Sequence, residues 1–254
     1  MERAIVFDFD LTLADSTKGV IECVNFALDG MDLPRADDER IRHTIGLSLK
    51  ATFQSLTGQK RNEDADVFVS RYVERADQIM ADLTVVYDGV QDTTAQLIEN
   101  GFELGIVSTK FRYRIEDILE REGLSDRFSI IVGGEDVTEH KPHPEGLLTA
   151  VSSLRMKTGN VYYVGDSMVD ALTAERAGVP FIAVLTGTTC ESDFNKLPNI
   201  AILDDVSALP RLFDALCSTS SRKRRASVCP LQAVTPFRPA IPPSTPRRNP
   251  CNRR

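Results

Sequence analysis

The chain has 254 residues, 42% of them hydrophobic, and a formal net charge of −7. This length and composition suit one large α/β domain, or one domain with an insert, and exclude a fibrous or repeat protein. Nine of the 30 basic side chains and none of the 37 acidic ones lie in residues 218–254, so the preceding body is strongly acidic. An acidic body argues against general binding of nucleic acids or anionic membranes, because both partners are polyanions.

The cysteines and the amino-terminal segment indicate the compartment. The five cysteines are scattered and form no C-x-x-C pair, which favours a reduced, cytoplasmic setting. The first apolar run contains acidic residues and does not resemble a secretory signal, and no apolar run approaches the roughly 20 residues needed to span a bilayer. We therefore expect a cytoplasmic protein without a membrane partner.

The first predicted strand covers residues 4–7, an apolar stretch typical of a buried parallel strand. Asp8, Asp10 and Thr12 follow at its carboxyl end, the edge where open α/β sheets bind ligands. The period-two alternation of a strand places the two aspartates on the same side. Because paired carboxylates are unfavourable unless a cation or phosphate chemistry uses them, we expect a catalytic pair. An acidic turn that caps the next helix is the alternative.

Residues 16–83 have a helical pattern without a plausible strand. Ser16 or Thr17 is expected to cap a helix that runs to about Leu28. Two further sets of apolar residues have helical spacing: Ile41, Ile45, Leu49 and Phe53, then Val67, Phe68, Tyr72 and Ile79. We interpret this segment as an inserted all-helical cap domain, because a crossover between parallel strands normally needs only one helix. Ordinary crossover helices are the alternative.

Residues 84–217 alternate between strands and helices, and together with residues 1–15 they are expected to form the core domain. Strands are predicted at 103–109, 128–132, 161–164 and 181–185, and helices at 90–100, 112–122, 144–154 and 169–177. Five or six strands that alternate with helices are typical of a doubly wound parallel sheet, a Rossmann-like α/β core.

The segment 218–254 has a different composition. It holds seven of the 13 prolines, no glycine and no acidic residue, which is typical of a disordered basic tail. A dispensable solvated extension is the favoured interpretation. Weak binding of anionic surfaces by the basic run 222–225, or presentation of Ser227 to a basophilic kinase, is the alternative.

Polar side chains follow several of the predicted strands. Because the carboxyl ends of parallel strands meet at one edge of the sheet, these side chains are expected to lie together. They are Asp8, Asp10 and Thr12, then Ser108 and Thr109, the loop 139–144 with Lys141, and finally Asp166 and Asp170. Two aspartates and a third carboxylate from another strand make an oxygen-lined site suited to Mg²⁺. A hydroxyl and a lysine would supply donors to phosphoryl oxygens.

Four motifs carry a resemblance to a known family. They are DFDLT at residues 8–12, GIVST at 105–109, HKPHPEG at 140–146 and GDSMVD at 165–170. In order and spacing they resemble the motifs of the haloacid dehalogenase superfamily of phosphotransferases. The helical insert resembles the smaller cap class of that superfamily. The best overall likeness, over about residues 2–215, is to phosphoglycolate phosphatases and their near relatives.

The resemblance implies a role for each matching residue. Asp8 would be the nucleophile that becomes an aspartyl-phosphate, and Asp10 would protonate the leaving oxygen and then activate water. Ser108 would hydrogen-bond the transferring phosphoryl group. Lys141 would neutralise that group and hold Asp8.

The resemblance also implies a bound Mg²⁺. Asp166 would bind it together with Asp8 and the backbone carbonyl of Asp10, and Asp170 would orient metal-bound water. The common family pattern has glycine where Leu11 stands, and we expect this departure to alter the turn rather than the chemistry.

Substrate choice in this family is attributed to the cap, and residues 42–48 are the matching segment. Arg42 or His43 would reach a substrate carboxylate, which would suit phosphoglycolate, but positions at a solvated helix end are an equal alternative. Lys110 follows the second motif directly, and it is either a substrate contact or a surface lysine.

The resulting hypothesis is a Mg²⁺-dependent phosphatase that acts on a small phosphorylated metabolite such as phosphoglycolate. A pyrophosphatase or a sugar-phosphate mutase remains open. A dehalogenase is disfavoured, because that reaction needs no metal and no second acid, whereas Asp10 and Asp166 are both present. A non-catalytic signalling receiver domain also has a phospho-accepting aspartate, but it lacks a cap.

Overall fold

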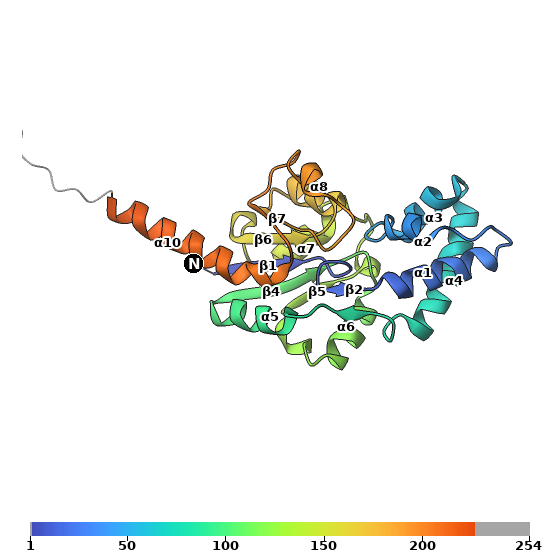
Figure 1. The fold of residues 1–254 in the computed structure, drawn as a ribbon, viewed down its shortest axis with the longest axis horizontal. Coiled ribbons are helices and arrows are strands. Elements are labelled where there is room, and N and C mark those ends of the chain that lie inside the picture. Colours follow the sequence, from blue (N-terminus) through green and yellow to red (C-terminus); the bar gives the residue numbers. More distant parts are fainter. Residues whose placement is uncertain (1, 227–254) are drawn as a thin grey trace, which may run out of the picture. The chain divides into compact units, whose positions relative to one another are not determined.

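The computed structural model describes residues 2–226, which are organised around a parallel sheet of six strands (Figure 1). The strand order is β5-β4-β1-β6-β7-β8, and every neighbouring pair is parallel. The strands are β1 (Arg3–Phe7), β4 (Phe102–Val107), β5 (Ile130–Val132), β6 (Val161–Gly165), β7 (Phe181–Val184) and β8 (Ala201–Leu203). Residues 4–7 are fully buried, because β1 lies between β4 and β6. The predicted doubly wound sheet is confirmed.

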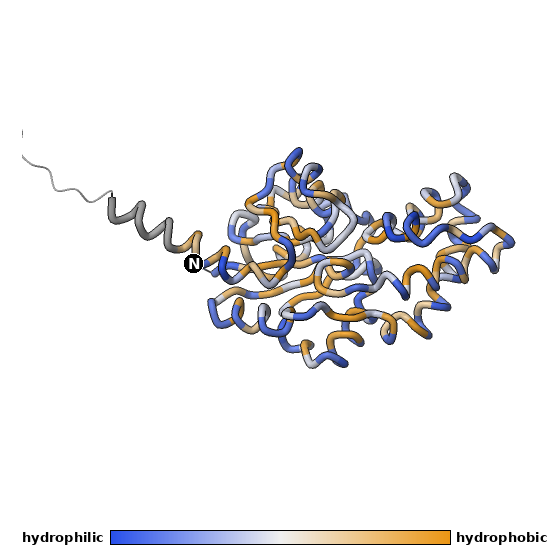
Figure 2. The backbone as a smooth tube through the Cα atoms, viewed as in Figure 1, coloured by the Kyte–Doolittle hydropathy of each residue, from blue (hydrophilic) through white to orange (hydrophobic). Residues whose placement is uncertain are grey.

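Helices cover both faces of the sheet (Figure 1). They are α5 (Val90–Glu99) and α6 (Arg112–Arg121) on one face, and α7 (Glu145–Ser153) and α8 (Met168–Ala177) on the other, with the short α9 (Glu191–Phe194) after β7. The side chains of β1 alternate between the two layers: Ile5 and Phe7 join one core cluster, and Ala4 and Val6 join the other. Figure 2 shows the apolar strands between helices whose outer turns are hydrophilic.

Four helices form an insert between β1 and β4. They are α1 (Thr17–Asp29), α2 (Asp38–Arg42), α3 (Leu49–Thr57) and α4 (Asn62–Ile79). These helices build a core of their own, in which the rings of Phe53 and Phe68 lie 5.3 Å apart. A separate core identifies an inserted cap, because crossover helices would bury their apolar faces on the sheet. The helical pattern was predicted without interruption, but loops separate the four helices, and Gly58 ends α3 with a φ of 71°.

The two segments that join the cap to the core pair with each other. β2 (Ala14–Asp15) and β3 (Val85–Val86) form a short antiparallel ladder, where the sequence predicted a turn and a simple return to the core. Strands of two residues have no periodicity that a sequence pattern can reveal. The sequence also gave no signal for β8, whose three residues are only partly buried. The β2–β3 pair joins segments that are distant along the chain, and β8 is a short edge strand beside β7.

Helix α10 (Leu209–Ala226) is the last described element. Its residues Leu209 and Phe213 belong to the core cluster on the α5 and α6 face and to the compact unit of residues 1–214. The helix includes the first residues of the segment predicted to be disordered, where arginine, lysine and alanine favour helix. The rest of that tail, residues 227–254 with Ser227, lies outside the described residues. No helix in the range 2–226 combines the length and apolar character needed to cross a bilayer.

Candidate active site

Polar side chains from three central strands meet at the carboxyl edge of the sheet. Asp8 and Asp10 follow β1, Ser108 follows β4, and Asp166 follows β6. The ladder continues into this edge, since the backbone N–H of Asp8 donates to the carbonyl of Val164 at 2.8 Å. All four polar side chains are buried. The structure therefore brings together strand-end residues that are up to 158 positions apart in the chain.

Asp8 is held at both carboxylate oxygens. Its Oδ1 accepts a hydrogen bond from the backbone N–H of Phe9 at 2.7 Å, and its Oδ2 lies 2.8 Å from Nζ of Lys141. Burial, followed by the neighbouring carboxylate of Asp170, raises the pKa of Asp8 to about 7 against the lowering effect of Lys141. The charged form of Asp8 therefore depends on positive charge beside it.

Lys141 contacts three side-chain oxygens. Besides Asp8, its Nζ lies 2.7 Å from Oδ1 of Asp170 and 3.2 Å from the hydroxyl of Tyr163. That hydroxyl also lies 2.9 Å from Asp170 Oδ1 and 3.1 Å from the carbonyl of Val107. Burial alone would lower the pKa of Lys141, but the carboxylates of Asp170 and Asp8 outweigh it and raise that pKa. Lys141 is a fixed, buried cation, not a solvated loop lysine. Ser108 and Lys141 line the same small cavity.

Asp8, Asp166 and Asp170 form the acidic cluster of the site. One carboxylate oxygen from each lies within 4.8 Å of the others, and all three side chains are buried. Burial, together with the charges of Asp170 and Asp8, raises the pKa of Asp166 well above its usual value. Three buried carboxylates that face a single lysine leave negative charge uncompensated. This donor set fits a hard divalent cation, which prefers oxygen ligands.

The start of α8 positions two of these carboxylates. Ser167 caps the helix: its Oγ accepts from the backbone N–H of Asp170 at 3.2 Å, and Oδ2 of Asp170 accepts from the N–H of Ser167 at 3.2 Å. This reciprocal capping box fixes the first turn. Asp166 lies directly before it and accepts a hydrogen bond from the hydroxyl of Thr12 at 3.0 Å. Thr12 thus has a defined contact with the acidic cluster.

Leu11 occupies a turn conformation that normally favours glycine. Its φ is 58°, its side chain is 2% exposed, and its carbonyl accepts a hydrogen bond from the hydroxyl of Thr186 at 2.5 Å. A left-handed conformation costs a non-glycine residue about 1–2 kcal/mol, and burial of a leucine side chain contributes about 1.5–3 kcal/mol in the opposite direction. Leucine is accommodated here in a glycine-like turn, with its side chain in the core.

Asp10 has a different partner from the acidic cluster. Its Oδ1 lies 2.9 Å from Nζ of Lys110, and both side chains are less than a tenth exposed. The surface-lysine alternative for Lys110 is therefore excluded. The side chain of Asp10 is not part of the three-carboxylate cluster. An interaction of its backbone carbonyl with a metal ion stays a prediction.

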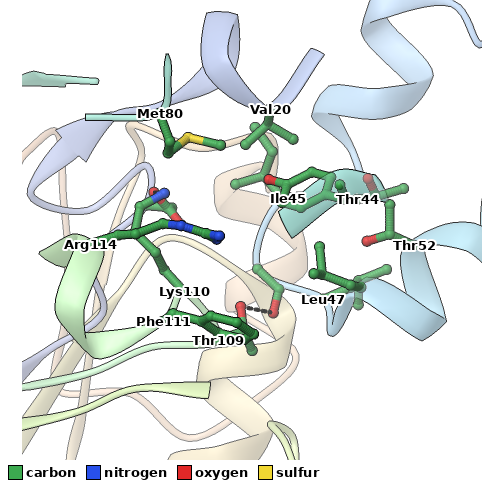
Figure 3. A pocket seen from close by; sticks show the side chains of 14 residues that line it. Val20, Thr44, Ile45, Leu47, Thr52, Met80, Thr109, Lys110, Phe111 and Arg114 are labelled. Carbon is green, nitrogen blue, oxygen red and sulfur yellow. Dashed lines mark hydrogen bonds and ion pairs between the residues drawn. The ribbon is translucent and has the colours of Figure 1, made fainter. Parts of the chain in front are cut away.

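A pocket lies between the cap and the core, next to Asp10 (Figure 3). The loop between α2 and α3 closes it from the cap side, and the hydroxyl of Thr109 reaches across to the carbonyl of Gly46 at 3.3 Å. The residues that line it are Asp10, Val20, Thr44, Ile45, Gly46, Leu47, Leu49, Thr52, Tyr72, Met80, Thr109, Lys110, Phe111 and Arg114. The pair formed by Asp10 and Lys110 therefore lies in the wall of this pocket.

Neither Arg42 nor His43 is among the residues that line this pocket. His43 is exposed, and its Nε2 lies 3.5 Å from a carboxylate oxygen of Glu39. The residues that directly follow, 44–47, do line the pocket. The basic side chains that line it, Lys110 and Arg114, come from the core.

Three residues of the site were missed by sequence reasoning. They are Arg114 in the pocket, Tyr163 beside Lys141, and Gly187, where an added Cβ would lie 2.0 Å from Oδ2 of Asp166. Arg114 carried one usable signal, because it shares the buried face of α6 with Ile115 and Ile118, a spacing that marks an interior position. For Tyr163 and Gly187 the partners belong to other segments, so the local sequence carried no signal.

The parallel sheet, the helical cap and the buried carboxylate and lysine residues at the sheet edge define a hydrolase with a Rossmann-like core and a cap domain. Comparison with known families identifies the group. The haloacid dehalogenase-like hydrolase family matches residues 5–184, and this chain belongs to that family. The match also excludes a signalling receiver domain.

Individual relatives agree with this assignment. The chain is 30% identical to a phosphoglycolate phosphatase of Salmonella typhimurium over 206 residues, which cover 73% of this chain and 82% of the relative. A phosphoglycolate phosphatase of Yersinia pestis is 31% identical over 196 residues, with the same coverage. Among solved structures, a haloacid dehalogenase-like hydrolase from Bacteroides fragilis is 39% identical. It has a TM-score of 0.80 and covers 82% of this chain and 100% of its own.

Proposed function

We propose that this enzyme is a Mg²⁺-dependent phosphatase that hydrolyses a small phosphomonoester, with phosphoglycolate as the favoured substrate. The observation that carries the proposal is the position of Asp8, which is ion-paired to Lys141 inside a cluster of three buried carboxylates. The pocket beside Asp10 supplies a route for a small substrate. The names of the relatives support phosphoglycolate in particular.

In the first step, a carboxylate oxygen of Asp8 attacks the phosphorus atom of the ester. The bond between phosphorus and the ester oxygen breaks, and its electron pair leaves with that oxygen, which Asp10 protonates. Lys141 keeps Asp8 charged and oriented at 2.8 Å, and Ser108 donates to a phosphoryl oxygen. The product of this step is an aspartyl-phosphate on Asp8.

In the second step, Asp10 accepts a proton from water, and the water oxygen attacks the phosphorus atom. The bond to Asp8 breaks, so its carboxylate is regenerated and inorganic phosphate is released. Lys110 lies 2.9 Å from Asp10 and holds its carboxylate in position for this proton transfer.

The residues that would hold Mg²⁺ are Asp8, Asp166 and the backbone carbonyl of Asp10. Asp170, which has a carboxylate oxygen within 4.8 Å of those of Asp8 and Asp166, would position water beside the ion. When bound, the ion supplies positive charge that stabilises the phosphoryl oxygens in the transition state. Thr12 and Ser167 orient the carboxylates of Asp166 and Asp170. A bound cation would also lower the pKa of Asp8, because a nearby opposite charge favours the ionised carboxylate.

A substrate comparison tests the proposal. Phosphoglycolate, pyrophosphate, glucose 1-phosphate and ethyl phosphate would be assayed with Mg²⁺ and with EDTA. We expect kcat/KM for phosphoglycolate to exceed the others at least about tenfold, since a recognised carboxylate contributes a charge-assisted hydrogen bond. We also expect EDTA to remove activity. Equal rates on all four compounds, preference for pyrophosphate or the sugar phosphate, or full activity in EDTA would contradict it.

Gly187 offers a test of the acidic cluster. Because a Cβ at Gly187 would lie 2.0 Å from Asp166 Oδ2, we expect Gly187→Ala to displace that carboxylate. The expected result is a kcat/KM that is about 10- to 100-fold lower and needs more Mg²⁺, as for other changes around metal ligands. The matched control is Gly159→Ala, whose Cβ meets nothing within 4 Å. An unchanged Mg²⁺ dependence in Gly187→Ala would count against Asp166 as a ligand.

The proposal includes a cytoplasmic setting. Cys23 and Cys190 are free thiols, as is usual in a reducing compartment. The proposed partner is the small phosphorylated substrate alone. The basic tail is not needed for catalysis, because every residue used above lies in residues 1–214.

A further inference from the structure

Arg114 is a buried cation in the wall of the pocket. Its side chain is 5% exposed, although it belongs to a pair with the half-exposed Asp77 of cap helix α4. Its Nη2 lies 2.6 Å and its Nε 3.1 Å from Oδ1 of Asp77, and Nη2 also donates to the carbonyl of Val73 at 3.3 Å. The guanidinium of a core helix is therefore bound by the cap.

Aromatic rings fix the same guanidinium. Its central carbon lies 5.0 Å from the centre of the Phe111 ring and 5.1 Å from that of Tyr113. The hydroxyl of Tyr113 donates to Asp77 at 2.6 Å, so the carboxylate that binds the arginine is itself held. An arginine fixed by a carboxylate and two rings loses little entropy when it binds a ligand.

One nitrogen of Arg114 remains available. Within residues 2–226, Nε and Nη2 have hydrogen-bond partners and Nη1 has none. Figure 3 shows the guanidinium reaching into the pocket beside Lys110. Asp77 is not among the residues that line this pocket, although Arg114 and Asp77 together line a second pocket.

The two cations of the pocket differ in what they face. Lys110 is ion-paired with Asp10. In the described part of the chain, Asp10 is the one acidic residue that lines the pocket. The charge of Lys110 is therefore committed to the catalytic acid. Arg114 has its positive charge offset only by Asp77, which is 47% exposed and screened by water. A second anionic group on the ligand would find Arg114 as its partner.

We propose that Arg114 binds the carboxylate of the substrate, the anionic group that is not transferred. This inference rests on the proposed function, since it names the residue that selects a carboxylate-bearing phosphomonoester. Because the same guanidinium holds Asp77 and the carbonyl of Val73, a substrate bound at Nη1 contacts an arginine that is already tied to the cap.

The test compares two esters in Arg114→Met and Arg114→Lys. Phosphoglycolate carries the carboxylate, and ethyl phosphate has the same two-carbon chain without it. We expect Arg114→Met to lower kcat/KM for phosphoglycolate by about 10- to 100-fold more than for ethyl phosphate, the range for a lost charge-assisted hydrogen bond. Arg114→Lys should fall between, because it keeps the charge without the planar fork.

Two controls separate substrate binding from the contact with the cap. Arg121, on the same helix, donates to the carbonyls of Ala81 and Thr84 near the cap junction but does not line the pocket. Arg121→Met should affect both esters equally. Asp77→Asn weakens the link to the cap and keeps the guanidinium, so its effect on ethyl phosphate measures how much that link alone contributes to activity. Equal losses on both esters in Arg114→Met would overturn the inference.

A binding experiment distinguishes failure of the inference from failure of the proposed function. In an Asp8→Asn background with Mg²⁺, calorimetric titration would measure phosphoglycolate and inorganic phosphate, with and without Arg114→Met. We expect the second substitution to weaken phosphoglycolate binding about 10- to 100-fold and to leave phosphate binding much less changed. If the wild type does not turn over phosphoglycolate, the proposed function falls. If Arg114→Met leaves phosphoglycolate binding unchanged, the inference falls alone.

Discussion

Replacing Asp8 with asparagine is expected to abolish phosphatase activity while the protein remains folded. The amide of asparagine cannot form the bond to phosphorus, so hydrolysis of p-nitrophenyl phosphate with Mg²⁺ should fall at least about 1000-fold, as for other lost nucleophiles. Folding should survive because the change preserves the shape of a side chain that is 1% exposed and that packs at the centre of the sheet edge.

Stability against pH provides a second readout for Asp8. Its pKa is raised from 3.8 to about 7, so the folded state holds the proton more tightly than the unfolded chain does. The stability from this group is present below pH 3.8 and is lost as the pH rises towards about 7. In EDTA, the difference in Tm between Asp8→Asn and the wild type should therefore shift in favour of Asp8→Asn as the pH rises from 3.8 to about 7, and then stay constant.

The matched control for this change is Asp117→Asn, an exposed acid-to-amide change on α6. It should have wild-type activity and no comparable change of Tm with pH. Substantial activity in Asp8→Asn would sink the aspartyl-phosphate mechanism. A Tm difference that does not vary with pH would show that Asp8 is not a buried group with a raised pKa.

Replacing Lys141 with methionine is expected to destabilise the protein as well as inactivate it. Lys141 Nζ lies 2.8 Å from Asp8 and 2.7 Å from Asp170, and all three side chains are less than a twentieth exposed. Removal of one partner from a buried charge pair typically costs about 3–5 kcal/mol, because the remaining charge is left uncompensated. Activity should fall at least about 1000-fold, since the nucleophile loses the cation that orients it.

The loss of stability in Lys141→Met should depend on pH. Lys141 lowers the pKa of Asp8, so its loss raises that pKa further. Protonation then relieves the repulsion, and the stability deficit should shrink as the pH falls. Urea unfolding in EDTA at two pH values would measure this. Lys157→Met, at an exposed lysine, is the control and should match the wild type. A deficit in Lys141→Met that is small and independent of pH would contradict the buried ion-pair network.

The residues at the sheet edge could be predicted from the sequence, because the topology of a parallel sheet brings the ends of its strands together. Apolar strands of predictable length end in Asp8, Ser108 and Asp166, and the carboxyl ends of parallel strands share one edge. The positions of these residues therefore followed without knowledge of any side-chain contact. Lys141 and Asp170, which come from a loop and a helix start, were included because they also follow predicted strands, and the motif resemblance supplied their roles.

The residues that line the pocket beneath the cap could not be predicted from the sequence in the same way. The segment at residues 42–48 was singled out, and residues 44–47 line the pocket, but the charged residues Arg42 and His43 do not. The cations that do are Lys110 and Arg114, which face the pocket because the cap packs over the start of α6. A sequence pattern gives the buried face of a helix, but it does not reveal which neighbour covers that face.

The sequence by itself determined the parallel sheet, the helical insert and the strand-end carboxylates, because periodicity and burial are encoded over short stretches of chain. The motif resemblance implied that Lys141 holds Asp8, but only the tertiary structure decided the partners Asp10 with Lys110 and Asp77 with Arg114. Each pair joins residues that are far apart in the chain, and the pairing offsets the cost of the charge that folding buries. The division of the two pocket cations, one for the catalytic acid and one for the ligand, is therefore a property of the packed molecule.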